Sequence, residues 1–437
     1  MARTKRATQA EWTIMVFLNA KNNLEPFAFK NFEQMAAIGS TDKVNVLVEF
    51  GRPQNHYSNA CGAWSKTLRF RVEKDMEPLE NAAVEDLGAT NMGDGAALAD
   101  FVTWARTNYP AKKTMLAIWD HGQGWRRRQL LNLRAERSAL RYIARSREAA
   151  RSRLGDAVGS LGAIPDDTRI LGGYRYVSHD EDTGDKLYNR EIQDALAGLA
   201  QTAKIDVIGF DACLMAMLET AYALRDAGTV MVGSEELEPG DGWSYDNFLA
   251  PLAADPEGID AAGLGSLMVE GYRKYYGDSD ATTLSAVDLT KTTKLANAVS
   301  QFAATASDKL ADHLPVLKQA RNACANYAPG YGLNSIDLGR FLDQVANAAG
   351  VNPALAKKAT TARNALHDMV IDNCASAQRK GKFGSEGVAI YFPKTQVDLD
   401  NDADGSAYQP GNTVYPVEFV DKQKWANFLH HYLTKVG

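Results

Sequence analysis

Cysteine is scarce in this chain of 437 residues, and long hydrophobic runs are absent. Four cysteines at widely separated positions are too few for a disulfide framework or a zinc site. No apolar run in the sequence approaches the roughly 20 residues of a membrane-spanning helix. The first apolar run, at residues 12–18, is too short for a signal peptide, and no small-residue cleavage site follows it. We therefore expect a cytoplasmic protein that has no membrane partner.

Glycine-rich phosphate-binding motifs are also missing from the sequence, since neither a Walker loop nor a dinucleotide-binding fingerprint occurs. What is present is an ordinary globular composition, with 45% hydrophobic and 23% charged residues. That composition excludes a largely disordered chain, a collagen-like repeat and a coiled-coil rod. The length fits two or three domains, or one large α/β unit with extensions.

One segment, residues 126–153, differs from the rest of the chain in charge. Its ten arginines and two acids give it a net charge of +8, which leaves −14 for the remainder of the chain. An amphipathic surface helix and a protease-sensitive linker both fit this composition. Nucleic-acid binding fits it less well, because the segment has one aromatic residue and no recognised binding fold surrounds it. The arginines are Arg126, Arg127, Arg128, Arg134, Arg137, Arg141, Arg145, Arg147, Arg151 and Arg153.

The rest of the sequence alternates between short β-rich runs and helical patterns. This alternation predicts an α/β protein with a mostly parallel sheet that helices cover on both faces. The predicted strands are residues 12–18, 44–50, 65–72, 114–119, 205–210, 229–233, 284–289 and 387–392. The predicted helices are residues 24–38, 96–108, 290–312, 315–327 and 353–378.

Two of the predicted strands end in residues that suit nucleophilic chemistry. One continues into Trp119-Asp120-His121-Gly122, and the other into Phe210-Asp211-Ala212-Cys213. The carboxyl ends of parallel strands meet at one edge of a sheet, so we expect the histidine and the cysteine to be neighbours. An imidazole beside a thiol favours the thiolate and later protonates a leaving amine.

Cys213 and His121 are therefore the candidate nucleophile and general base. We expect the backbone N–H groups of Gly122 and Cys213 to form an oxyanion hole. A helix predicted to begin at Cys213 would further favour the thiolate. The alternative, from residue types alone, is a buried structural cysteine and a loop histidine that has no catalytic role.

Longer stretches around these residues resemble the clostripain family of caspase-like cysteine peptidases. Two features depart from the family pattern: Lys21 stands where an acid is expected, and the segment after Trp125 is longer and more basic. The similar segments are WTIMVFLNAKNNLE (12–25), AIWDHGQGW (117–125), IDVIGFDACLMAMLETAYAL (205–224), VGSEELEPGDGWSYDNFL (232–249), ATTLSAVDLTK (281–291), GLNSIDLGRFL (332–342) and GVAIYFPK (387–394).

This resemblance implies a caspase-like α/β/α sandwich extended by C-terminal strands and helices. It divides the chain into a polar tail (1–11), a peptidase core (12–250) interrupted by residues 126–153, and a C-terminal α/β region (251–437). It implies that His121 is the general base and acid, that Cys213 is the nucleophile, and that cleavage follows Arg or Lys. Such chemistry requires no cofactor, and the resemblance is compatible with calcium dependence.

Cleavage after a basic residue requires an acidic pocket beside the nucleophile. We expect Asp211 and Asp241 to line that pocket, with Trp243 either as a wall of it or as part of the core. The glutamates of residues 235–238 make the neighbourhood acidic, but a run of charges is more typical of an exposed loop face.

Two acidic stretches are candidate calcium sites. Residues 400–405 match the first half of a calcium-binding loop, but Gly411 stands where the bidentate glutamate belongs. Residues 179–185 form a second acidic stretch. An ordinary acidic turn explains both stretches better, and no metal ligands are assigned.

The resemblance suggests a role for the Arg-rich segment, because arginine is the residue type that the expected acidic pocket would accept. We predict a proenzyme whose cleft is occupied by residues 126–153 until the segment is cut, by the enzyme itself or by an upstream protease. The expected partners are protein substrates with exposed Arg, and nucleic acid is not expected. The rival hypotheses are a catalytically silent scaffold and a nucleic-acid-binding protein that uses this segment.

Overall fold

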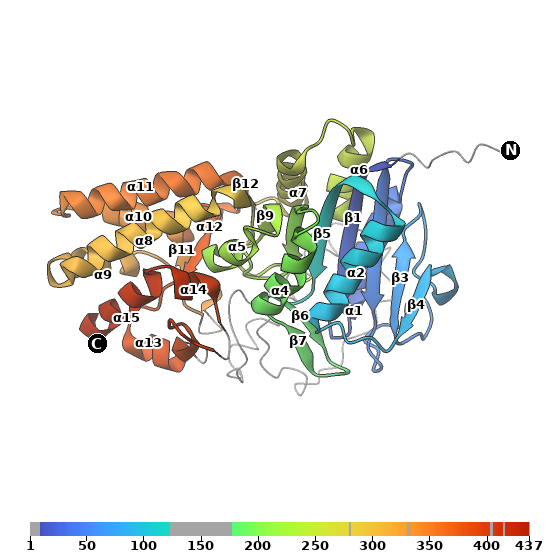
Figure 1. Ribbon diagram of the computed structural model, residues 1–437, viewed down its shortest axis with the longest axis horizontal. Coiled ribbons are helices and arrows are strands. Elements are labelled where there is room, and N and C mark those ends of the chain that lie inside the picture. The colour runs from blue at the N-terminus through green and yellow to red at the C-terminus, as the bar shows by residue number, and fades with distance from the viewer. Residues whose placement is uncertain are drawn as a thin grey trace.

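The computed structural model of the protein describes residues 9–122, 177–278, 281–329, 333–402, 405–413 and 416–436. The Arg-rich segment 126–153 and all of its arginines lie outside these residues. Figure 1 shows a central sheet with helices on both faces and a cluster of C-terminal helices at one end.

The central sheet has nine strands in the order β12-β10-β9-β8-β5-β1-β2-β3-β4. The five inner strands, from β9 to β2 in this order, are parallel to one another. On each side, two outer strands are added, and each pairs antiparallel with the strand before it. The strands are β1 (Ala10–Asn19), β2 (Val44–Gly51), β3 (Thr67–Arg71), β4 (Glu85–Gly88), β5 (Ala111–Trp119), β8 (Ile205–Asp211), β9 (Gly228–Gly233), β10 (Thr283–Asp288) and β12 (Val370–Ala375).

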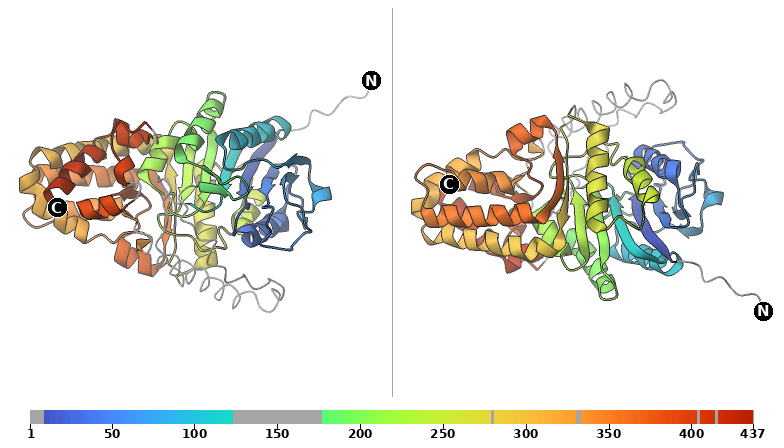
Figure 2. Two further views of the ribbon diagram at one scale, coloured as in Figure 1. Left: turned by 90° about the horizontal axis from the view of Figure 1, so that it is seen from below. Right: turned by 90° about the horizontal axis from the view of Figure 1, so that it is seen from above.

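The inner strands are apolar along their length because both faces of the sheet are covered. In β1, Met15 and Phe17 belong to the core on one face, and Ile14 and Val16 belong to the core on the other. The first face is covered by α2 (Gly95–Asn108), α4 (Asn189–Ala200) and α5 (Leu218–Leu224), and the second by α1 (Glu25–Ile38), α6 (Tyr245–Ala254) and α7 (Ala261–Tyr276). Figure 2 shows these two helix layers from below and above. The predicted α/β fold with a mostly parallel sheet is thus confirmed.

The C-terminal helices continue one of these cores instead of building a separate one. Leu224 of α5 and Phe302 of α8 belong to the same buried cluster, and the helices lie beside the sheet at the left of Figure 1. They are α8 (Thr292–Asp308), α9 (Leu310–Asn322), α10 (Leu338–Ala346), α11 (Pro353–Met369), α12 (Ala377–Phe383), α13 (Gln396–Asn401), α14 (Glu418–Lys422) and α15 (Trp425–Val436).

Two short sheets and three 3₁₀ helices complete the described elements. The sheets pair β6 (Val177–Asp180) with β7 (Asp185–Leu187), and β11 (Ser335–Asp337) with β13 (Ala389–Tyr391). The 3₁₀ helices are η1 (Glu80–Ala82), η3 (Leu289–Lys291) and η5 (Gly405–Ala407).

Two sequence-based expectations about these elements were wrong. The helix predicted over residues 353–378 ends at Met369, and the next six residues form β12 at the edge of the central sheet. The strand predicted over 387–392 is shortened to β13, which pairs outside the central sheet. The proposed domain boundary at residue 250 stays a prediction, although β10 and β12 from beyond it join the same sheet.

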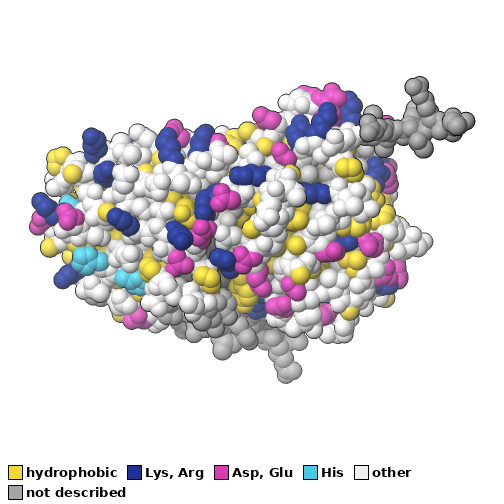
Figure 3. All heavy atoms as spheres, in the orientation of Figure 1, with side chains coloured by type: hydrophobic (Ala, Val, Ile, Leu, Met, Phe, Trp, Pro, Cys, Tyr) yellow, Lys and Arg dark blue, Asp and Glu magenta, His cyan; other side chains and the backbone are white. Residues whose placement is uncertain are grey.

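The chain order divides the central sheet into two halves. Strands β1 to β5 precede residues 126–153, and β8, β9, β10 and β12 follow them. In the described sheet these halves meet where β5 pairs with β8, from Met115 beside Val207 to Trp119 beside Asp211. No helix in the described parts of the chain is long and apolar enough to cross a bilayer. Figure 3 shows charged side chains of both signs interspersed over one face of the molecule.

Candidate active site

The predicted histidine and cysteine follow two neighbouring parallel strands. Trp119 and Asp211 lie side by side in the β5–β8 ladder, and the N–H of Asp120 donates to the carbonyl of Asp211 over 3.4 Å. His121 and Cys213 therefore leave the sheet at one edge, as the sequence predicted.

A buried carboxyl group, Asp120, holds the backbone at His121. It accepts hydrogen bonds from the N–H of His121 at 2.5 Å, the N–H of His179 at 2.5 Å and the Nδ2 atom of Asn22 at 2.8 Å. Burial raises the pKa of Asp120 well above its usual value, while these hydrogen bonds lower it. The carboxyl group thus joins the ends of β1, β5 and β6 around the histidine.

The His121 side chain is held by Asn23, because Nε2 lies 2.8 Å from Oδ1 of that residue. The amide oxygen accepts only, so Nε2 donates, and Nδ1 of the neutral ring is the acceptor. Burial lowers the pKa of His121 to about 4. The resting imidazole is therefore neutral and suited to accept a proton.

Cys213 lies in a turn, and the expectation that a helix begins there was wrong. Helix α5 begins at Leu218, so helix-end N–H groups do not stabilise a thiolate at Cys213. Two other backbone groups reach the sulfur: the N–H of Glu238 lies 3.2 Å from Sγ, and the backbone of Gly122 also hydrogen-bonds to it. Burial, with a smaller contribution from the charge of Glu238, nevertheless raises the pKa of the thiol to about 12.

Gly122 is required by the close approach of the two strand ends. A Cβ atom at this position would overlap the backbone carbonyl and N–H of Cys213. The glycine therefore allows the backbone at Gly122 to approach the backbone of Cys213 closely. The predicted role of their N–H groups as an oxyanion hole stays a prediction.

Asp211 precedes Cys213 by two residues, lies inside the protein and is 4% exposed. Its carboxyl group accepts hydrogen bonds from the N–H of Trp243 and the hydroxyl of Tyr245, each at 3.0 Å. The side chain of Glu238 is in hydrogen-bonding contact with the same carboxyl group. Burial raises the pKa of Asp211 to about 7.

Asp241, the other predicted pocket acid, is already paired. Its Oδ2 atom lies 2.9 Å from Nζ of Lys30 and accepts a hydrogen bond from the hydroxyl of Tyr275 at 3.1 Å. Trp243 is 2% exposed and packs against Gly209 of β8, within the core on that face. The structure thus brings Asp211 and Asp241 into one neighbourhood. Tyr276 lies near both: burial raises the pKa of its hydroxyl, and the charges of the two aspartates raise it further.

The glutamates of residues 235–238 are buried, so the expectation of an exposed loop face was wrong. Glu235, Glu236 and Glu238 are 1%, 1% and 7% exposed. Glu236 forms a 2.6 Å ion pair with Arg379, and Glu235 contacts Asp337 and accepts from the N–H of Gly387. The segment follows β9 at the edge of the sheet that carries the site. That position, rather than the composition, was the signal that could have identified it.

No functional role was predicted for the loop after β1, although it belongs to a segment that resembles the family. Asn22 and Asn23 contact Asp120 and His121, as described above. Lys21, the departure from the family pattern, is 2% exposed and lies 3.1 Å from the buried carboxylate of Asp180. The ends of β1, β5, β8 and β9 all meet at this edge, which explains why this loop contributes.

Neither acidic stretch forms a metal site as far as its residues are described; Ala403 and Asp404 of the first stretch lie outside the described residues. No group of three or more His, Cys, Asp or Glu residues among the described ranges could hold a metal ion. Asp400 accepts a hydrogen bond from Gln396, Asp402 accepts one from Tyr391, and Asp180 is the partner of Lys21. The structure therefore gives calcium dependence no support.

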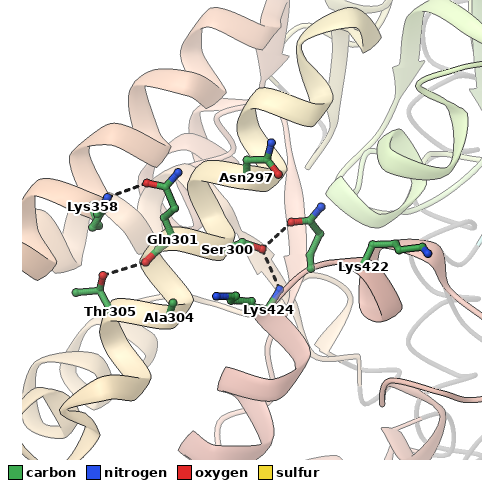
Figure 4. A pocket seen from close by; sticks show the side chains of 9 residues that line it. Asn297, Ser300, Gln301, Ala304, Thr305, Lys358, Lys422 and Lys424 are labelled. Atoms are coloured by element: carbon green, nitrogen blue, oxygen red, sulfur yellow. Dashed lines mark hydrogen bonds between the residues drawn. The ribbon is translucent and has the colours of Figure 1, made fainter.

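A cavity of about 530 Å³ lies away from the dyad, among the C-terminal helices (Figure 4). Its lining is polar, and Ser300 and Gln301 of α8 hydrogen-bond to Gln423 and Lys358 across it. No cysteine or histidine lines this cavity. It is therefore not a second candidate for thiol chemistry.

Comparison with known proteins agrees with this geometry. The clostripain family model matches residues 16–136 and 162–432. Clostripain from Hathewaya histolytica is 22% identical over 429 residues, which cover 87% of this chain and 74% of clostripain.

Two solved structures of C11 cysteine proteases share the fold over almost the whole chain. A secreted enzyme from Bacteroides thetaiotaomicron, solved with an irreversible peptide inhibitor, has a TM-score of 0.59 at 18% identity and covers 94% of this chain and 99% of its own. An inactive zymogen from Parabacteroides distasonis has a TM-score of 0.56 at 14% identity and covers 97% and 99%. The chain belongs to the clostripain family and is a cysteine peptidase.

Proposed function

We propose that this peptidase uses Cys213 as nucleophile and His121 as general base and acid, and that it cuts after Arg, and less readily after Lys. One observation carries the specificity. Asp211 and Glu238 are both buried beside Cys213, and neither forms an ion pair with a lysine, arginine or histidine of the described chain. Buried carboxyl groups without a cation are costly, unless a ligand supplies the cation.

The proposed reaction starts from a neutral thiol and a neutral imidazole, in agreement with the two pKa directions. The thiol proton moves to Nδ1 of His121 as Sγ attacks the scissile carbonyl carbon. The oxyanion accepts hydrogen bonds from the N–H groups of Gly122 and Cys213. The imidazolium then protonates the leaving amine, and water attacks the thioester with His121 again as base.

Asp211 is proposed as the main contact of the substrate cation. It is buried, it lies next to the proposed nucleophile, and it has no cationic partner among the described residues, whereas Asp241 is already neutralised by Lys30. A guanidinium group can bridge neighbouring carboxyl oxygens with several N–H groups, which favours Arg over Lys. Protein substrates with exposed Arg are the partners that this site fits.

We also propose that the chain is made as a proenzyme and cut within residues 126–153. The segment begins five residues after His121 in the sequence, and its arginines are the residue type that Asp211 is proposed to accept. The cut would leave a light chain with His121 and a heavy chain with Cys213. A cytoplasmic location also stays part of the proposal; the relative with the bound inhibitor is described as secreted.

A peptide panel tests the specificity. Fluorogenic peptides with Arg, Lys, citrulline or Asp before the scissile bond are compared on wild type, Cys213→Ala, Asp211→Asn and Asp241→Asn. Cys213→Ala should be inactive, and Asp211→Asn should lower kcat/KM for Arg by roughly 10²-fold, since a lost buried ion-pair partner costs about 3–5 kcal/mol. Asp241→Asn should lose less. Equal cleavage after Arg and citrulline in wild type would refute selection of Arg by its charge.

Sequencing of new N-termini tests the processing. Wild-type protein, after activation, should show a new N-terminus that follows an arginine between residues 126 and 153. Its absence in Cys213→Ala under the same conditions identifies self-cleavage, and its appearance there on addition of wild type identifies cutting in trans. Full activity in an uncut single chain, or in a chain with the ten arginines replaced by glutamine, contradicts the proposal.

A further inference from the structure

A second buried acid, Glu238, lies beside Asp211. Its side chain is in hydrogen-bonding contact with the Asp211 carboxyl group, and its backbone N–H lies 3.2 Å from the sulfur of Cys213. The residue is 7% exposed. No hydrogen bond of ordinary geometry reaches either carboxylate oxygen of Glu238 within the described chain, although the indole of Trp243 lies near enough to lower the pKa of this acid slightly against the larger effect of burial. Two facing carboxyl groups can hydrogen-bond to each other only if one of them carries a proton.

The surroundings of this pair contain acids and phenols but no cation among the described residues. The Asp211 carboxyl group accepts from the hydroxyl of Tyr245 in α6, and the hydroxyl of Tyr276 in α7 donates to the carbonyl of Gly242 at 2.7 Å. The other titratable groups nearby are Cys213, Glu236 and Asp241.

Three cationic or imidazole side chains of the described residues near this pair have other partners. Lys30 of α1 neutralises Asp241, and Arg379 of α12 neutralises Glu236. His121 at the end of β5 is directed to Asn23. Burial consequently raises the pKa of Glu238 well above its usual value, and the pKa of Asp211 to about 7.

We propose that Glu238 is a further specificity-determining residue, which shares one proton with Asp211 in the empty pocket and gives that proton up when an Arg side chain enters. This inference rests on the proposed cleavage after Arg. A single O–H bond breaks and the proton leaves to solvent. The guanidinium then donates N–H groups to both carboxylates, so its charge replaces that of the proton.

Two consequences follow for substrate choice. The shared proton lowers the buried charge of the empty pocket from two negative charges to one. A neutral side chain brings no charge that could replace the proton, so it binds without forming an ion pair. Binding of Arg becomes coupled to pH, because each bound ligand must release a proton while the pair is protonated.

The experiment measures protons released on binding. Active enzyme is first capped at Cys213 with methyl methanethiosulfonate, which removes both cleavage and thiol titration. Nα-acetyl-arginine amide is then titrated calorimetrically at pH 6.5 in two buffers with different heats of protonation. The neutral isostere, Nα-acetyl-citrulline amide, is the ligand control. Wild type should release about one proton per bound arginine amide.

Glu238→Gln should release far less, because the glutamine amide donates to Asp211 permanently and keeps it ionised. Glu235→Gln is the matched control variant: it alters another buried acid pair, with Asp337, that lies outside the pocket. It should release as many protons as wild type. Kinetics report the same coupling, since Glu238→Gln should flatten the rise of kcat/KM for Arg peptides between pH 6 and 8.

The outcomes separate this inference from the proposed function. Preferred cleavage after Arg with no proton release in wild type, or with equal release in Glu238→Gln, overturns the proton pair and leaves the specificity intact. Equal binding of the arginine and citrulline amides, with no preference in the peptide panel, overturns cleavage after Arg itself.

Discussion

At the scale of single residues, the asparagines after β1 explain how a neutral imidazole is kept in one tautomer. Asn23 accepts a hydrogen bond from Nε2 of His121. Asn22 donates one to the Asp120 carboxyl group, which in turn accepts from the backbone N–H of the same histidine. Asn23 therefore acts on the reaction through the position of His121 and is not expected to bind the substrate's basic side chain.

Replacing Asn23 with alanine should lower kcat by about 10²-fold, because a misplaced general base loses its alignment with the thiol. KM for an Arg peptide should stay near the wild-type value, since the acids of the pocket are untouched. Steady-state kinetics at saturating substrate measures the split. Asn45→Ala is the control, because Asn45 donates to Thr13 at the far end of the strands. An equal loss of kcat in both variants would contradict the positioning role.

The sequence was sufficient to predict His121 and Cys213, because each follows a recognisable strand and parallel strands end at one edge. It was not sufficient for Asn22 and Asn23, because a polar loop after β1 shows no periodicity that would point it towards another strand end. Glu238 was misjudged for a related reason: a run of acids is usually exposed, and only the fold shows that the carboxyl end of β9 is covered.

At the scale of elements, the β6–β7 hairpin is the first described segment after the Arg-rich insertion, and the earlier half of the chain holds it tightly. Asn19 donates to Ser178 at 2.8 Å, and the N–H of Glu181 donates to the carbonyl of Lys21 at 2.9 Å. The buried ion pair of Lys21 and Asp180 joins the same two segments. A cut between them should therefore leave the two chains attached.

Lys21→Met should destabilise the protein by about 3–5 kcal/mol, because it leaves the Asp180 carboxylate buried without its partner. Urea unfolding of the Cys213→Ala protein measures this without self-digestion. Arg190→Ala, which removes an exposed ion pair with Asp194, should change the free energy of unfolding by at most about 0.5 kcal/mol. Equal, small effects of both changes would show that the Lys21 pair does not hold the hairpin.

Most strands and helices were predictable from their apolar runs, and the errors lie where local pattern and tertiary contacts disagree. The stretch CLMAMLETAYAL has helical spacing from its first residue, but the strand-end turn at Cys213 delays α5 to Leu218. Similarly, β12 continues the helical pattern of α11, and only pairing with β10 makes it a strand.

At the scale of the whole molecule, buried acids should make stability depend on pH. Burial raises the pKa of Asp211 and of Glu49 to about 7, and that of Glu235 well above its usual value. Such a group keeps a proton in the folded protein that the unfolded chain releases, so stability falls as pH rises towards the folded pKa. The buried histidines 121 and 179, with lowered pKa values, oppose this only below about pH 6.5.

The melting temperature of the Cys213→Ala protein should therefore fall between pH 6.5 and 8. Each proton taken up on folding contributes a slope of about 1.4 kcal/mol per pH unit. Calorimetric scans at fixed ionic strength measure the trend. Glu235→Gln should reduce the slope, because its amide can donate to Asp337 without a shared proton. A melting temperature that rises over this range would contradict the assignment of protonated buried acids.

The seam between β5 and β8 has a consequence for the lifetime of a two-chain enzyme. His121 and Cys213, the proposed catalytic pair, lie on opposite sides of this seam, and the ladder from Met115 to Trp119 against Val207 to Asp211 closes it. If the halves separated, each would present a long, flat, apolar strand with unpaired backbone groups, which is a template for edge-to-edge aggregation. Loss of activity and loss of solubility would then be one event, so a dissociated enzyme could not return to its substrates.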